Sequence, residues 1–157
     1  TMCASIDGTG PIGEFIRTGL KWDEWDRNFR EGVALPGGND KMIMDLTITG
    51  PGLFDIKNFL DYALELDVKI ESKRMFAFHA DIVLSPMAWP RHILDDIVND
   101  LLDYCRPRVT EKQQTLIREL EGLLESPTFQ EEWPDIYSEH PELWSWWNRP
   151  DPKHNQR

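Results

Sequence analysis

Hydrophobic and polar positions in the first half of the chain switch repeatedly between the strand period and the helix period. Apolar or alternating runs predict strands at 3–6, 42–49 and 68–73, the last continuing into the apolar run 75–78. Apolar positions at helical spacing predict helices at 22–31 and directly after Asp55, which is a suitable N-cap. Loops rich in Gly and Pro lie at 7–11, 36–40 and 50–52.

The second half of the chain has only helical periodicity, and then loses it. An apolar stripe from Ile93 to Leu102 predicts a helix through Tyr104, entered through Pro86 and Pro90. Thr110 and Gln113 form a capping-box pattern before a second helix, whose inner face is Leu116, Ile117, Leu120, Leu123 and Leu124. Residues 127–157 hold five prolines and four of the seven tryptophans, which indicates an irregular tail that Trp side chains attach to the domain.

The order strand, helix, strand, helix, strand is typical of βαβ units with a parallel sheet, so the predicted fold class is α/β. The chain has 157 residues, of which 40% are hydrophobic, enough for a core and enough to exclude wholesale disorder. The net charge of −11 disfavours a nucleic-acid partner, which needs a basic face. No apolar run approaches the roughly 20 residues that cross a bilayer, so no membrane partner is expected.

The cysteine content bears on both the compartment and the chemistry. The two cysteines, Cys3 and Cys105, argue against a disulfide framework and against a multi-cysteine metal site, which favours a cytoplasmic location. Cys3 lies within an apolar strand, so a buried structural thiol is expected there. The chain opens with Thr1 in the middle of a strand, without a signal-peptide pattern, which predicts that a preceding part is missing.

Candidate chemistry gathers where the predicted parallel strands end. Ser5 and Asp7 lie on the same side of an extended backbone, and a hydroxyl beside a carboxylate can hold a diol such as a ribose. The alternative is an Asp that caps its own Gly-rich turn. Thr49 ends the next strand, and Gly50 after it would let the backbone approach a ligand closely. The alternative is a plain loop that joins the strand to the next helix.

The histidines give weaker signals. His79 and Asp81 follow the third strand and could bind a metal or move protons, but two ligands are too few and a solvated loop histidine is the simpler interpretation. The sequence contains no H-E-x-x-H, G-x-S-x-G, P-loop or G-x-G-x-x-G motif.

Two ordered groups of motifs carry a family resemblance. The first group is Ser5-Ile6-Asp7-Gly8, then Glu14 and Ile16-Arg17, then Lys21-Trp22-Asp23-Glu24-Trp25. The second is Leu46-Thr47-Ile48-Thr49-Gly50-Pro51-Gly52, then Phe78-His79 to Ser85-Pro86, then Trp89-Pro90. Over residues 2–125 the chain resembles the radical S-adenosylmethionine (radical SAM) enzymes, in their twitch-domain branch common in phage and marine bacterial sequences.

The resemblance implies the C-terminal half of a partial (β/α) barrel. It implies a radical-SAM-like unit at 1–90, C-terminal helices at 91–126 and the Trp/Pro-rich tail at 127–157. By position, Ser5 and Asp7 correspond to the ribose contacts of S-adenosylmethionine (SAM), Arg17 to a contact of its carboxylate and Thr49 to an adenine-side contact. The family holds a 4Fe–4S cluster on a CxxxCxxC motif, which this sequence lacks, so the chain is expected to hold no cofactor and to be inactive alone.

Half a parallel barrel leaves one edge strand unpaired, so we expect that edge to be covered. Either a homo-oligomer forms through the edge, or the Trp-rich tail folds over it. The alternative function is a small acidic protein-binding module of the inhibitor or immunity type, recognising a basic partner through its charge. A third hypothesis is a hydrolase that uses His79 and Asp81. It needs a bound metal, for which the sequence offers too few ligands.

Overall fold

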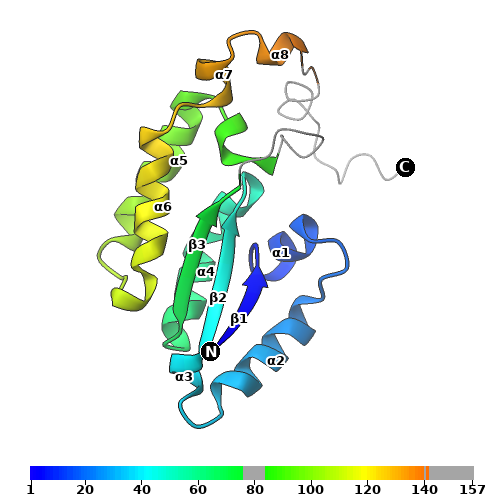
Figure 1. Cartoon of the computed structure of the whole chain (residues 1–157), viewed down its shortest axis with the longest axis vertical. Coiled ribbons are helices and arrows are strands. Elements are labelled where there is room, and N and C mark those ends of the chain that lie inside the picture. Colours follow the sequence, from blue (N-terminus) through cyan, green and yellow to red (C-terminus); the bar gives the residue numbers. More distant parts are fainter. Residues whose placement is uncertain (76–83, 140, 142–157) are drawn as a thin grey trace.

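The chain builds one three-stranded parallel sheet with helices packed against it. The structure is a computed structural model that describes residues 1–75, 84–139 and 141. Its strands are β1 (Met2–Ile6), β2 (Met42–Ile48) and β3 (Lys69–Arg74), in the order β1-β2-β3 and parallel throughout (Figure 1). The predicted α/β class and the parallel sheet are therefore confirmed.

The predicted helices are present, together with several short helices that the sequence patterns did not predict. They are α1 (Gly10–Ile16), α2 (Trp22–Val33), α3 (Gly38–Lys41), η1 (Pro51–Asp55), α4 (Ile56–Glu65), η3 (Pro86–Ala88), α5 (Arg91–Cys105), η4 (Glu111–Gln113), α6 (Gln114–Glu125), α7 (Phe129–Glu132) and α8 (Ile136–Glu139). The capping box of Thr110 and Gln113 is present as predicted. Parts of all three predicted loops are instead the short helices α1, α3 and η1, because Pro11 and Pro51 fit a first helical turn and Gly37 takes the left-handed conformation (φ 69°) before α3.

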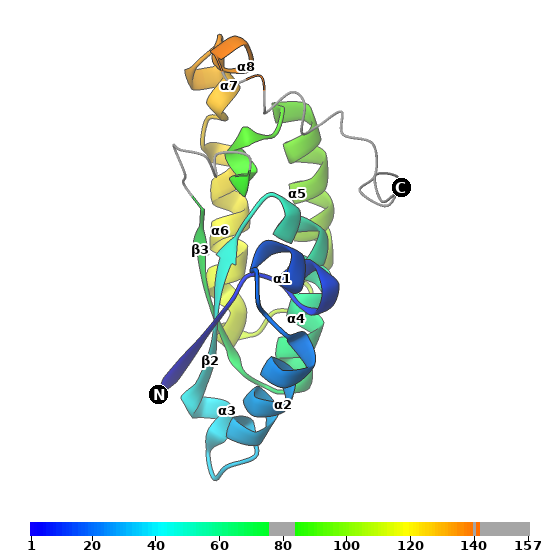
Figure 2. The ribbon, with the colours of Figure 1, turned by 90° about the vertical axis from the view of Figure 1, so that its right-hand side faces the viewer.

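The two faces of the sheet differ in chemistry. Along β2, Met42, Met44, Leu46 and Ile48 are buried, while the alternate residues Ile43, Asp45 and Thr47 are half-buried. In Figure 2 the helices α1, α2, α4 and α5 lie to one side of the strands, which is the side that buries the apolar positions. The opposite face, here called the open face, carries Cys3, Ser5, Ile43, Asp45, Thr47, Lys69, Glu71 and Lys73. None of the helices in the described ranges could cross a membrane.

Aromatic packing holds α2 against α4. Trp25 stacks on Phe29 with ring centroids 4.7 Å apart, and both rings face Tyr62 of α4. The Tyr62 hydroxyl donates to Asp26 at 2.6 Å, and Arg30 lies over the Tyr62 ring while it pairs with Asp26. Burial and the hydrogen bond to Asp26 raise the pKa of Tyr62, so the phenol stays protonated and donates.

The outer edge of β3 is closed by the segment that begins α6. The Gln113 amide donates to the Val68 carbonyl at 2.8 Å, and the Thr115 hydroxyl donates to the Ile70 carbonyl at 2.7 Å. The same hydroxyl accepts from the Ser72 N–H at 3.1 Å. Two side chains therefore replace the neighbouring strand that would otherwise satisfy these backbone groups.

Arg91 joins the start of α5 to the end of α6. Its guanidinium donates to the Leu123 carbonyl at 3.1 Å and to the Ser126 carbonyl, and it pairs with Asp95 and Glu131. A cation near the last carbonyls of a helix is favourable because these groups carry the negative end of the helix dipole. The contact with Glu131 extends this junction to α7.

The Arg91–Glu131 contact predicts a pH-dependent stability. The Arg91 guanidinium, and then the Thr128 N–H, lower the pKa of Glu131 from 4.5 to about 2. Because the folded-state pKa is lowered, the contribution to stability is present above about pH 4.5 and is lost as the pH falls toward 2. We expect the difference in free energy of unfolding between the wild type and Glu131→Gln, measured by urea denaturation, to shrink across that range. Glu132→Gln is the matched control, and a difference independent of pH would contradict the assignment.

Candidate functional site

The candidate site lies at the carboxyl ends of β1 and β2. The chain leaves β1 at Ile6 and turns through Asp7, Gly8 and Thr9 into α1. It leaves β2 at Ile48 and turns through Thr49 and Gly50 into η1. Because the strands are parallel and adjacent, both turns lie at the same end of the sheet, beyond the carboxyl ends of the strands. Ligands bind there in open α/β folds.

Arg17 brings together three of the four predicted site residues. It follows α1, and its Nε donates to Asp7 Oδ2 at 3.1 Å while the guanidinium forms an ion pair with the same oxygen at 2.9 Å. The guanidinium also donates to the Ser5 hydroxyl at 3.2 Å and to the Ser5 carbonyl at 3.3 Å. The Arg17 side chain is 41% exposed, so part of its donor fork faces solvent.

The Asp7 carboxylate has one satisfied and one unsatisfied oxygen. Its side chain is 11% exposed, and Oδ2 is held by Arg17. Oδ1 is buried and has no hydrogen-bond partner in the part of the chain that the structure describes. A buried acceptor without a partner costs free energy, so a hydroxyl or ammonium donor that reached this oxygen after a local movement of the loop would be stabilising.

Thr49 lies beside Asp7 but uses its hydroxyl within its own turn. Its Oγ1 accepts from the Gly52 N–H at 3.0 Å, and the residue is only 2% exposed. A Cβ on Gly52 would fall 2.8 Å from Thr49 Oγ1 and 3.0 Å from the Asp7 carbonyl. The two strand ends therefore approach each other closely around Gly52, and the hydroxyl of Thr49 serves this turn and not the cluster that Arg17 holds.

Asp55 holds the loop after β1 and was not predicted to do so. It is buried, its carboxylate accepts from the Thr9 N–H and the Thr9 hydroxyl, and Asn58 donates to it at 3.1 Å. Asp55 is the N-cap residue of α4 as predicted, but its side chain makes no capping hydrogen bond to that helix. The sequence did hold a signal for this contact, since Asp55 lies between the apolar residues Phe54 and Ile56. A carboxylate buried among such neighbours needs a specific hydrogen-bond partner.

Cys3 differs from its prediction. It is exposed and not buried, because β1 is an edge strand and Cys3 lies on the open face. Cys105 is buried on α5, and burial raises the pKa of its thiol to about 11. His79 and Asp81 lie outside the described residues, as does most of the Trp-rich tail. Among residues 1–75, 84–139 and 141, no group of three or more His, Cys, Asp or Glu side chains is placed to hold a metal ion.

Comparison of the chain with protein-family models, with curated proteins and with solved structures finds no match. The candidate site offers a hydroxyl, a buried carboxylate oxygen and a partly exposed guanidinium, all at the end of one strand.

Loss of Arg17 should destabilise the loop after β1. Arg17→Met leaves the largely buried Asp7 carboxylate without its cation, and we expect a loss of about 1 kcal/mol in free energy of unfolding because Arg17 is partly exposed. Arg17→Lys keeps the charge but not the fork, so it should lose less. Urea denaturation of the three proteins measures this, and equal stability of Arg17→Met and wild type would refute the contact.

The close approach around Gly52 gives a second prediction. Gly52→Ala should cost about 1–3 kcal/mol in free energy of unfolding, because the new Cβ meets Thr49 and the Asp7 carbonyl. Removing one of these neighbours in Gly52→Ala/Thr49→Ala should make the combined loss smaller than the sum of the single losses. Additive losses in thermal or urea denaturation would show that the two positions are not in contact.

Proposed function

We propose that this chain is the C-terminal half of a radical SAM-type (β/α) barrel and that its site binds the nucleoside and carboxylate parts of SAM. In this proposal the open face of the sheet lines the barrel interior. Ser5, Asp7 and Arg17 contact the ligand at the strand ends, and Thr49 supports the adenine side. The chain by itself binds without catalysing cleavage.

The observation that carries the proposal is the cluster that Arg17 assembles. Ser5 and Asp7 supply a hydroxyl and a buried, unpartnered carboxylate oxygen, which are suitable partners for the two hydroxyls of a ribose. Arg17 keeps part of its guanidinium toward solvent, where it can pair with a carboxylate. These groups match the diol and the carboxylate of SAM, and a ligand hydroxyl would satisfy Asp7 Oδ1.

The arrangement of the sheet agrees with a barrel segment. Parallel sheets are usually covered by helices on both faces and carry apolar residues on both. Here the described helices bury one face, while the open face carries Asp45 and Lys73 as an ion pair at 2.8 Å and Lys69 paired with Glu71. A barrel has helices outside and strand side chains inside, so helices on one face alone fit a barrel segment, whereas the charged side chains of the open face differ from the branched apolar interior of most barrels.

The 4Fe–4S cluster of the resembled family does not fit this chain. The sequence has two cysteines, and cluster binding uses several thiolates. Cys105 is buried on α5 with its pKa raised to about 11, which disfavours the thiolate. Since reductive cleavage of SAM takes its electron from the cluster, we assign no catalytic step to these residues.

The acidic binding module is less well supported. It calls for unpaired carboxylates on one surface, whereas Asp45 and Glu71 on the open face are paired with Lys73 and Lys69. A face on which charges are balanced offers no field to attract a basic partner.

Titration with SAM, followed by NMR chemical shifts and calorimetry, tests the proposal. We expect weak binding, with Kd on the order of millimolar, and shifts at Ser5, Asp7 and Arg17, because only part of a pocket is present. Ser5→Ala, a change at an exposed hydroxyl, should weaken binding by about 3- to 10-fold through one lost hydrogen bond.

Ser138→Ala, at an exposed serine of α8, is the matched control and should bind like the wild type. Adenosine and methionine titrated separately distinguish the ribose contacts from the Arg17 contact. Shifts that avoid the β1 end, or equal affinity of wild type and Ser5→Ala, would refute the assignment.

A further inference from the structure

The two edges of the sheet differ in how far side chains of the same chain satisfy their backbone groups. The outer edge of β3 is closed by Gln113 and Thr115, as described above, and β3 carries four charged residues in six positions. Both features prevent a further strand from pairing there. Neither feature is found at the other edge.

The outer edge of β1 is left open by the described residues. The contact of Arg17 with the Ser5 carbonyl is the single hydrogen bond that they supply to the β1 backbone from outside the sheet. The five residues Met2–Ile6 include no charge and no proline. An uncharged edge without a bulge or a proline lacks the usual protection against strand pairing, which indicates that it is used for pairing.

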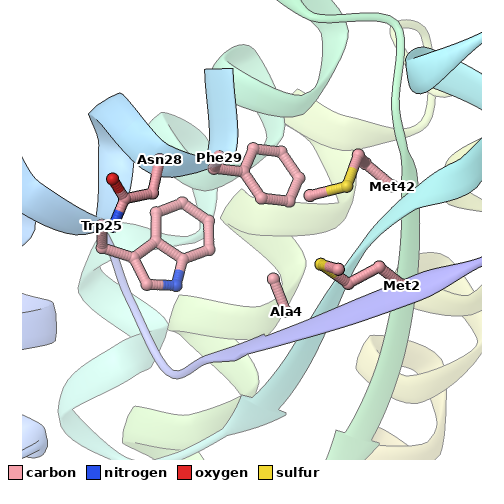
Figure 3. A pocket seen from close by; sticks show the side chains of 6 residues that line it. All are labelled: Met2, Ala4, Trp25, Asn28, Phe29 and Met42. Atoms are coloured by element: carbon pink, nitrogen blue, oxygen red, sulfur yellow. The ribbon is translucent and has the colours of Figure 1, made fainter. Parts of the chain in front are cut away.

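An apolar cavity lies beside this edge. It has a volume of about 150 Å³ and lies on the helix side of β1, between that strand and α2 (Figure 3). Met2 and Ala4 of β1 point toward Trp25 and Phe29 of α2, and Met42 and Asn28 complete the lining (Figure 3). Side chains on the helix side of an added strand would lie over this cavity, since alternate residues of neighbouring strands share a face.

We infer that a second copy of this chain occupies the edge, with β1 pairing antiparallel to β1 of the second copy about a two-fold axis. Such an interface is self-complementary, and the neutral strand brings no like charges together although each chain carries −11. Met2, 62% exposed in the single chain, becomes buried at the cavity of the pair. The result is one continuous six-stranded sheet made from two copies of the three strands. This inference concerns the 157-residue chain by itself and does not depend on SAM binding, since in a complete barrel a preceding strand would pair with β1 in place of the second copy.

Sedimentation equilibrium of the full chain tests the inference. We expect a dimer whose dissociation constant rises at least about tenfold in Met2→Glu, because the two-fold axis brings two new carboxylates into an apolar interface. Phe54→Glu is the matched control, since Phe54 is 60% exposed and lies on η1, where its ring packs edge-on against Trp89, and its change should leave the dimer intact. Added salt should tighten the dimer by screening the charge of −11.

Cys3 provides an internal probe, because it is exposed on β1 whereas Cys105 is buried. A short bismaleimide should link two copies of the wild type; Cys3→Ser should abolish the product, and Met2→Glu should reduce it in proportion to the lost dimer. Circular dichroism checks that each variant is folded.

Three outcomes would overturn the inference. A dimer that Met2→Glu leaves unchanged would place the interface on another surface. A monomer with slow amide exchange in β1 would mean that a segment of the same chain covers the edge. A monomer with fast exchange there would mean that nothing covers it.

Discussion

The backbone hydrogen bonds of a three-stranded parallel sheet are the constraint on which this structure depends. Each edge strand presents N–H and C=O groups that need partners other than a neighbouring strand. At β3 the hydroxyl of Thr115 and the amide of Gln113 supply those partners, which also fixes α6 beside the sheet. At β1 the described chain supplies only Arg17. The fold is thus closed at one edge and open at the other.

The same parallel arrangement creates the candidate site. Each strand runs in the same direction, so the loops after β1 and β2 leave the sheet side by side and Gly52 allows them to approach. Asp55 fixes the first loop through Thr9, and Arg17 reaches back from beyond α1 to hold Ser5 and Asp7. One carboxylate oxygen, Oδ1 of Asp7, is left buried and without a partner among the described residues of this network.

Local patterns predicted the elements that depend on near neighbours. The alternating burial of β2, the long apolar stripe of α5 and the capping box before α6 each follow from residues within a few positions of one another. The short helices α1 and α3 were missed because Gly and Pro favour loops and first helical turns alike. Strand alternation predicted that the side chains of Ser5 and Asp7 lie on the same side of the backbone. In the structure both side chains accept hydrogen bonds from Arg17.

The sequence by itself determined the α/β class, the order of the strands and the longer helices, and the polar residues at the strand ends, since these depend on periodicity and local capping. Only the tertiary structure decided which partners those residues have. Asp55 binds Thr9, 46 positions away, and its side chain makes no capping hydrogen bond to its own helix. Cys3 is exposed because its strand lies at an edge and faces away from the helices. The periodicity of a sequence shows which face of a strand is apolar. It does not show which edge of the sheet remains open, because the covering of an edge depends on contacts between distant segments.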